Sequence, residues 1–446
     1  MKTPILDFIN KYNEEDITRL HMPGHKGKGS FGYESFDITE FDGADSLYSA
    51  NGIIKESEEN ASLLFDSGAT FYSCEGSSLS VRAMCYLALA YALVKGQGER
   101  PWALAGKNAH ASFLSASVLL DFDIKWLHSE NGGYLSGDIS PKEIEKVLSR
   151  VDNLPFCVYI TSPDYLGNVT DISSISRVCK KYGVMLLVDN AHGAYLKLLG
   201  KNIHPLDLGA TMCCDSAHKT LPVLTGGGYL HISKDAPSFF KENAKRALSL
   251  FGTSSPSYLI LSSLDSANQY LATKKEELVT FAREIDRLKD SLVRNGYELV
   301  GNEPLKITIL AKKYGYLGSE LYSILYKNGL VCEFYDKDYL VMMLTPKNSK
   351  DALDKIKNVL LSIPKKEEIL DTPPTFLSCK QVLSPRDAFM SASEEIKVEN
   401  ALGRIMAGLS ISCPPAVAVV ASGEEINEGA IKMLKYYGID KCRFVK

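Results

Sequence analysis

Short apolar segments alternate with amphipathic ones through the first half of the chain. Segment 184–188, VMLLV, is continuously apolar, as expected of a strand that is buried on both faces. Helical patterns run over 79–94 and over the residues between Asp171, a capping residue, and Gly183, a stop residue. This alternation predicts an α/β fold with a mostly parallel sheet. The expected strands are 71–74, 102–105, 156–161, 184–188, 211–214 and 228–232.

The pattern changes after about residue 255. A long helical stretch with charge runs covers 257–296, and a smaller α/β unit follows it to about residue 363. Residues 364–374, rich in charge and proline, have the composition of a linker. An apolar strand at 416–421 and a helix at 424–437 are expected beyond it. The predicted parts are an N-terminal arm (1–30), a large domain (31–255), a connecting helix with a small α/β domain (256–363) and a C-terminal domain (364–446).

Composition narrows the range of functions. The chain has 446 residues, and its 50 Lys and Arg against 54 Asp and Glu give a formal net charge of −4. Nucleic-acid-binding proteins usually carry a basic excess, so this balance argues against nucleic acid as a partner. The ten cysteines include no C-x-x-C pair, which argues against a structural zinc site and a redox dithiol.

The apolar segments also bear on where the protein works. The N-terminal residues include no apolar stretch of the kind that a secretory signal has. The longest apolar run, about 86–94, is far shorter than the roughly 20 residues that span a bilayer. We therefore expect a cytoplasmic protein with reduced cysteines and no membrane partner.

The most informative polar stretch is Asp215-Ser-Ala-His-Lys-Thr220, directly after an expected buried strand. Taken alone, Lys219 is more often a solvated side chain. The alternative is a lysine that forms a Schiff base, because the lysine pKa falls readily near positive charge or away from water. Ser216 and His218 would then be close enough to contact a phosphate group.

Asp189 favours the Schiff-base alternative for Lys219, because it directly follows the buried segment 184–188. Ligands of α/β folds bind at the carboxyl ends of parallel strands. A carboxylate there can pair with a pyridinium nitrogen and keep it protonated, which makes the ring an electron sink.

The sequence Asp189-Asn-Ala-His192 also resembles the acidic box of nucleotide hydrolases. Those enzymes need a phosphate loop in which Gly-Lys is followed by Ser or Thr. The Gly-Lys pairs here begin at Gly27, Gly106 and Gly200, and the next residues are Gly, Asn and Asn. The nucleotide-hydrolase hypothesis therefore fails.

Two further segments could contact such a cofactor. Gly76-Ser77-Ser78 opens the 79–94 helix, where free N–H groups suit a phosphate, although serines at a helix start are also ordinary caps. His110 follows an expected strand and could stack on a ring, although a lone histidine is more often structural. The histidines of His21-Met-Pro-Gly-His25 are separated by helix-breaking residues, so we expect no metal site there.

Taken in order, these segments resemble the Orn/Lys/Arg decarboxylase family, fold-type I enzymes that depend on pyridoxal 5'-phosphate. The resemblance is to the short form, which lacks an N-terminal wing domain, and it covers nearly the whole chain. It implies an aspartate-aminotransferase-like large domain, a smaller α/β domain and a decarboxylase-type C-terminal domain. Besides the segments above, the matching stretches are Pro23-Gly-His-Lys26, Asp37-Ile-Thr-Glu40, Thr253-Ser-Ser-Pro-Ser-Tyr258 and Leu383-Ser-Pro-Arg-Asp-Ala-Phe389.

The resemblance implies a role for each matching position. Lys219 would carry the cofactor, Asp189 would bind its pyridine nitrogen, and His192 would lie near its phenolic oxygen. His110 would stack on the ring. The predicted catalytic residues are thus Lys219, His110 and Asp189. The predicted cofactor-binding residues are Lys219, Asp189, His192, His110, Gly76, Ser77, Ser78, Ser216, His218, Thr253 and Ser254.

The family's active sites lie at a dimer interface. The resemblance therefore implies a homodimer in which Thr253 or Ser254 reaches the phosphate of the second subunit. The implied reaction is decarboxylation of lysine, arginine or ornithine to an amine and CO2, within polyamine biosynthesis. An aminotransferase or β-eliminating lyase of the same fold, and a non-catalytic homologue, stay open as alternatives.

Several positions depart from the family's pattern. Glu75 stands in place of an asparagine, Asn190 in place of an acidic residue, and Tyr195 in place of a histidine. None belongs to the implied cofactor set, but Glu75, Asp45-Ser46 and the C-terminal domain could affect which amino acid is bound. The C-terminal departure is Pro414-Pro-Ala416, where the family has Pro-Pro-Gly.

Overall fold

The structure is a computed structural model that describes the chain except residues 98–99, 128–134, 137–138, 201, 375–377 and 410–416. Its residues form two compact units. The first combines Met1–Gly98 with Met185–Lys275, and the second combines Glu99–Val184 with Glu276–Lys446. The domain boundaries predicted at residues 30, 255 and 363 stay predictions.

The strands of the first unit lie in the order β1-β7-β6-β5. β5 and β6 are parallel, whereas β7 is antiparallel to both of its neighbours. β5 is buried almost throughout, as its apolar sequence predicts. The strands are β1 (Ala69–Ser73), β5 (Met185–Asp189), β6 (Met212–Asp215) and β7 (Gly228–Ile232).

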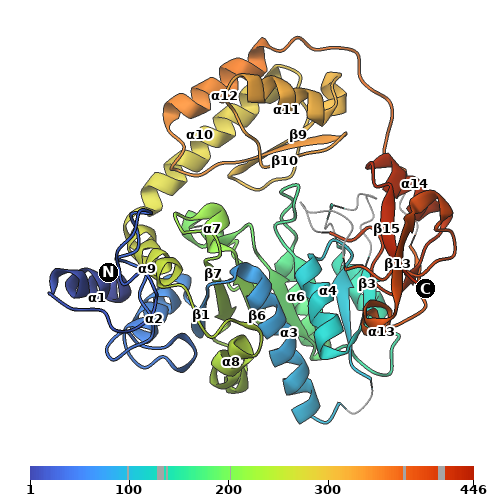
Figure 1. Cartoon of the computed structure of the whole chain (residues 1–446). Helices are drawn as coiled ribbons and strands as arrows, with labels where there is room; N and C mark the ends of the chain where they lie inside the picture. The colour runs from blue at the N-terminus through green and yellow to red at the C-terminus, as the bar shows by residue number, and fades with distance from the viewer. Residues whose placement is uncertain (98–99, 128–134, 137–138, 201, 375–377, 410–416) are drawn as a thin grey trace. The chain divides into compact units, whose positions relative to one another are not determined.

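Helix α3 (Gly76–Val94) is the longest helix of the first unit, and it packs against α8, β6 and β7 (Figure 1). By length and composition it could cross a membrane, but 56% of its most apolar window is buried inside the fold, as in a core helix. The other helices are α1 (Pro4–Glu14), α2 (Ile53–Phe65), α7 (Ala217–Thr220), α8 (Ser238–Phe251), α9 (Tyr258–Thr273) and the 3-10 helices η1 (Leu47–Ser49) and η2 (Ala194–Leu199).

A buried carboxylate ties three helices of this unit together. Asp265 of α9 accepts hydrogen bonds from the backbone N–H groups of Ile5 and Leu6 at 2.9 and 3.0 Å, at the start of α1. Its other oxygen accepts the Ser57 hydroxyl of α2 at 2.5 Å. Burial raises the pKa of Asp265 to about 6, although these hydrogen bonds act in the opposite direction.

This pKa predicts a pH-dependent stability. Because the folded state holds the Asp265 proton more tightly than the unfolded chain does, its contribution is present below about pH 4 and is lost as the pH rises through 6. A shift of two units corresponds to about 3 kcal/mol. In the variant Asp265→Asn, the free energy of unfolding should not fall in this way between pH 4 and pH 7. Urea unfolding of both proteins at the two pH values measures the difference. An equal change in unfolding free energy in both proteins would contradict the prediction.

The second unit contains the strand order β4-β2-β3, all parallel. As predicted, Asp171 caps α6 by accepting the backbone N–H of Ser174, and Gly183 ends that helix at φ +68°. The sequence pattern missed β3, because this edge strand mixes buried and exposed positions. The elements are β2 (Trp102–Gly106), β3 (Asp123–Leu127), β4 (Cys157–Thr161), α4 (Ala111–Leu120), α5 (Pro141–Leu148) and α6 (Ile172–Tyr182).

A small antiparallel sheet in the order β10-β11-β9-β8 follows, with three α-helices and one 3-10 helix. The helical stretch predicted over 257–296 is two helices that are separated at Lys274, the residue directly after α9. The elements are α10 (Lys275–Arg294), β8 (Leu299–Val300), β9 (Lys306–Leu310), η3 (Ala311–Tyr314), α11 (Gly318–Lys327), β10 (Phe334–Tyr335), β11 (Tyr339–Met343) and α12 (Lys350–Ser362).

The C-terminal part contradicts two predictions. Of the predicted strand 416–421, residues 417–421 are not a strand, and Val417 makes only an isolated bridge. Pro414-Pro-Ala416 lies outside the described residues. The helix predicted from 424 starts at Glu428, because Asn427 caps it and accepts the N–H of Ala430 at 2.9 Å. Residues 364–374 have no helix or strand, as expected of a linker. The elements are β12 (Lys380–Gln381), α13 (Pro385–Met390), β13 (Ser393–Lys397), η4 (Val398–Asn400), β14 (Glu424–Glu425), α14 (Glu428–Tyr436) and β15 (Lys441–Val445).

Candidate active site

The carboxyl ends of β5 and β6 bring the two main sequence motifs together. The strands are parallel, Asp189 pairs in register with Cys214, and the N–H of Asn190 donates to the Cys214 carbonyl at 2.9 Å. The segment after β5 therefore runs beside the segment after β6. This edge of a parallel sheet is where α/β folds bind their ligands.

Lys219 lies on α7, a single helical turn that follows β6 directly. Its Nζ is 3.0 Å from Nε2 of His192, a buried residue on the segment after β5. Because the turn is so short, Lys219 stays at the edge of the sheet and is half-buried. The structure thus brings together the predicted Schiff-base lysine and the predicted neighbour of the cofactor's phenolic oxygen.

Asp189 is the last residue of β5 and is only 2% exposed. One of its oxygens accepts the N–H of Ala191 at 3.1 Å and lies 3.7 Å from the Cys214 thiol. A carboxylate in such surroundings is well suited to pair with a cationic ring nitrogen, because that partner offsets the cost of burying its charge.

The start of α3 and the segment after β6 form a cradle of polar groups. The Ser216 hydroxyl donates to the Ser77 hydroxyl at 2.8 Å, and the Ser77 N–H donates back to Ser216 Oγ at 3.3 Å. Ser78 lies on the same first turn, whose N–H groups point out of the helix end. Such a helix end, lined with hydroxyls, fits a phosphate.

His218 and Gly76 complete this cradle. His218 Nδ1 donates to the Gly227 carbonyl at 2.9 Å, and a Cβ on Gly76 would lie 3.5 Å from the edge of the imidazole. Gly76 has φ +66°, a conformation that favours glycine. Burial lowers the pKa of His218, and the charge of Lys219 lowers it further.

The segment Gly226-Gly227-Gly228 passes very close to the neighbouring backbone. Gly226 has φ +100°, and a Cβ there would lie 2.8 Å from the Cys74 carbonyl. A Cβ on Gly228 would lie 2.9 Å from the Asp215 carbonyl. These glycines therefore allow β7 to pass close behind the cradle.

Thr253 and Ser254 lie between α8 and α9 and are both exposed. The Thr253 N–H donates to Glu75 Oε1 at 2.7 Å, so Glu75 ties this loop to the start of α3. The predicted contact of Thr253 or Ser254 with a second subunit stays a prediction.

Asp45 holds the backbone at the start of α2. Its carboxylate accepts the N–H groups of Ser46, Asn51, Gly52 and Ile54 at 2.8 to 3.0 Å. Burial alone would raise the pKa of Asp45, but these bonds hold it below its usual value. A carboxylate with so many hydrogen bonds to its own chain is a poor candidate for substrate recognition.

His110 belongs to the second unit, where it caps α4. Its Nδ1 accepts the N–H of Ser112 at 3.1 Å, so the neutral imidazole carries its proton on Nε2. The side chain is half-buried. The stacking of His110 on the cofactor ring stays a prediction.

Sequence reasoning missed a buried network around Asp215, the residue before Ser216. Asn190 Nδ2 donates to Asp215 Oδ1 at 2.6 Å, while His204 Nε2 and His231 Nε2 lie 3.2 and 3.1 Å from Oδ2. Burial would raise the pKa of Asp215, but the two imidazoles hold it well below its usual range. An acidic residue at position 190 would face Asp215 with a second carboxylate, whereas the Asn190 amide donates to it.

The ligating atoms of His204, Asp215 and His231 lie within 4.8 Å of one another, as in a metal site. The N–H of Leu206 donates to His204 Nδ1 at 3.4 Å, which leaves the proton of neutral His204 on Nε2, facing Asp215. Thr70 Oγ1 contacts His231 Nδ1 at 2.8 Å. We therefore interpret the cluster as a hydrogen-bonded support for the segment that leads to Lys219.

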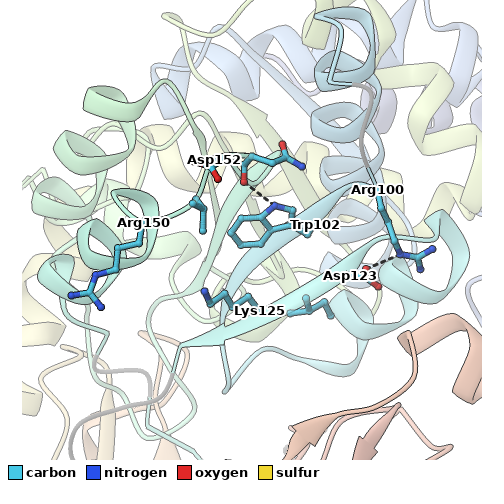
Figure 2. A pocket seen from close by; sticks show the side chains of 9 residues that line it. Arg100, Trp102, Asp123, Lys125, Arg150 and Asp152 are labelled. Atoms are coloured by element: carbon cyan, nitrogen blue, oxygen red, sulfur yellow. Dashed lines mark hydrogen bonds and ion pairs between the residues drawn. The ribbon is translucent and has the colours of Figure 1, made fainter.

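A hollow of about 570 Å³ lies elsewhere in the second unit (Figure 2). Trp102 and Asp123, which line it, are the first residues of β2 and β3. Trp102 donates to the Asn153 carbonyl at 3.2 Å, and Arg100 pairs with Asp123 at 2.6 Å. Because it lies at the amino ends of these strands, this hollow is not the site expected of a parallel sheet.

The chain is similar to known proteins over nearly the full length of both partners. Bacillus subtilis YaaO, an uncharacterized protein, is 29% identical over 97% of this chain and 94% of its own length. The arginine decarboxylase of Bacillus subtilis is 26% identical over 97% of this chain and 93% of its own length.

Solved structures share the fold. The E. coli constitutive lysine decarboxylase has a TM-score of 0.76 at 16% identity and covers 100% of this chain and 82% of its own. Lysine decarboxylase A from Pseudomonas aeruginosa has a TM-score of 0.80 at 15% identity, and the match covers 99% of this chain and 80% of that protein's chain. The serine palmitoyltransferase of Sphingomonas wittichii has a TM-score of 0.56 at 16% identity. This match covers 80% of this chain and 83% of that protein's chain. The chain is thus of the fold-type I, mainly parallel α/β class.

Two family models match the chain itself. The model of the Orn/Lys/Arg decarboxylase major domain matches residues 3–300, more than half of the chain. The model of the C-terminal domain of the same family matches residues 375–441. The chain therefore belongs to the Orn/Lys/Arg decarboxylase family, whose cofactor is pyridoxal phosphate.

Proposed function

We propose that this protein decarboxylates a basic amino acid (lysine, arginine or ornithine) to the corresponding amine and CO2. The observation that carries the proposal is the meeting of Lys219, His192 and Asp189 at the carboxyl ends of β5 and β6. The names of the relatives support the substrate class, since they include arginine decarboxylases that match over nearly the whole chain.

The residues at this edge fit pyridoxal phosphate. Ser77, Ser216 and His218 form a cradle for the phosphate at the start of α3. Asp189 supplies a buried carboxylate for the ring nitrogen, and Lys219 supplies the amine that carries the cofactor. When bound, the cofactor supplies a cationic ring that accepts the electrons left behind as the substrate's carboxylate departs as CO2.

The chain's own groups prepare this chemistry. The Asp189 carboxylate would keep the ring nitrogen of the bound cofactor protonated, because a buried negative charge favours a positive partner. Lys219 must lose a proton to become a nucleophile, and His192 Nε2, 3.0 Å from Nζ, is placed to accept it. Burial of the surrounding strands excludes bulk water and strengthens both interactions.

The proposal includes a homodimer and a cytoplasmic location. Thr253 and Ser254 are exposed and could contact a second subunit, as the resemblance to the family implies, which supports the dimer. A protein that makes amines from basic amino acids would serve polyamine biosynthesis.

A substrate panel tests the proposal. The protein, loaded with pyridoxal phosphate, is incubated with single amino acids, and the products are identified by mass. Amine formed from lysine, arginine or ornithine in equal amount to CO2 is the expected result. A keto acid with the pyridoxamine form of the cofactor would instead identify an aminotransferase, and no product from any amino acid would favour a non-catalytic homologue.

A further inference from the structure

A buried ion pair joins the C-terminal part of the chain to the segment that ends in His110. Lys107 Nζ lies 2.7 and 2.6 Å from the two carboxylate oxygens of Glu424. The side chains are only 8% and 2% exposed. Lys107 follows β2, while Glu424 begins β14, 317 residues later.

Both charges of this pair have further partners. Lys107 Nζ also lies 4.7 Å from the centre of the Trp126 ring, and Glu424 Oε2 accepts the N–H of Ala421 at 2.6 Å. The Lys107 N–H donates to the Leu127 carbonyl at 2.9 Å. A buried pair that is so well satisfied fixes geometry, because moving either partner would leave a charge unpaired away from water.

The same C-terminal part contacts both ends of α4, the helix that His110 caps. His110 forms an isolated antiparallel bridge with Val417. At the other end, Arg386 Nη1 lies 3.4 Å from the carbonyls of Val118 and Leu119. A cation at a helix C-terminus is favourable, so both contacts hold α4 in one place.

His110 itself is fixed to α4, because its Nδ1 accepts the N–H of Ser112. A movement of 107–110 would therefore move the imidazole with it. We propose that Glu424 is a positioning residue, which holds His110 in place through Lys107. The inference rests on the proposed function and on the sequence-based prediction that His110 stacks on the cofactor ring.

Three substitutions test this role in the full-length protein. Glu424→Gln keeps the shape of the side chain and removes its charge, and Lys107→Met does the same for the partner. Lys107→Arg keeps the charge and should retain near-normal behaviour. Glu395→Gln is the matched control, because Glu395 lies on the same part of the chain in an exposed pair with Lys441 at 3.7 Å.

We expect Glu424→Gln and Lys107→Met each to lower kcat by roughly 10- to 100-fold with little change in KM, since a small misplacement of a catalytic group costs about this much. The double variant should be no worse than either single one, because both remove the same interaction. The visible circular dichroism of the bound cofactor should change in both, and Glu395→Gln should change nothing.

A readout without cofactor separates this inference from the proposed function. In the apoprotein, hydrogen exchange at 107–112 should be faster in Glu424→Gln than in the wild type and Glu395→Gln. If wild-type protein makes no amine, the proposed function fails, while exchange and dichroism still decide the positioning role. A Glu424→Gln protein that melts earlier but keeps wild-type kcat, dichroism and exchange would overturn the inference.

Discussion

Replacing Lys219 with alanine is expected to lower the rate of CO2 release by roughly 10³-fold or more and to abolish the visible absorption of the bound cofactor. The reason is covalent: the amine of Lys219, 3.0 Å from His192 Nε2, is the group inferred to carry the cofactor. The phosphate cradle of Ser77 and Ser216 remains intact in this variant, so weak cofactor binding should persist. Activity assays and absorption spectra of the loaded protein measure both effects.

A charge-preserving variant separates the chemistry from electrostatics. Lys219→Arg keeps a cation at the same place but cannot form the same covalent bond, so it should be as inactive as Lys219→Ala. Lys241→Ala, at an exposed position on α8, is the control and should behave like the wild type. Retention of visible absorption and of CO2 release in Lys219→Ala would show that another lysine carries the cofactor.

The second large effect is expected for Asp189→Asn. An amide cannot stabilise a protonated ring nitrogen as the buried carboxylate does, so kcat should fall by roughly 10²- to 10⁴-fold. Cofactor affinity should fall much less, because Ser77, Ser216 and His218 still hold the phosphate. The two quantities are measured separately, by steady-state kinetics and by titration of the apoprotein with cofactor.

Asp189→Glu is the matched control for this effect. It keeps the charge but moves it by one methylene, so it should retain more activity than Asp189→Asn. Equal loss in both variants, with equal loss of cofactor affinity, would mean that Asp189 serves only to hold the end of β5.

Local sequence patterns predicted much of the large sheet. The VMLLV run predicted β5 within one residue, since a short, continuously apolar run between turn residues is typical of a strand that is buried on both faces. Asp171 and Gly183 fixed the limits of α6, because capping is a local effect. The family match then confirmed the predicted family, its decarboxylase class and its cofactor.

Long-range contacts account for what the sequence did not predict. The apolar run 416–421 predicts a strand, but Val419 and Val420, which are described, lie in no strand and are buried in a core cluster with residues such as Met433. The partners of Asp215 come from three separate segments, at 190, 204 and 231. The pairing of Lys107 with Glu424 likewise has no local signature, since only folding brings these residues together.

The most direct measurement identifies the lysine that carries the cofactor. Borohydride reduction of the loaded protein makes the cofactor–lysine bond permanent, and digestion followed by mass spectrometry locates the modified peptide. We expect the modification on Lys219, in the peptide that contains Ser216 and His218. Modification of a different lysine, or of none, would contradict it.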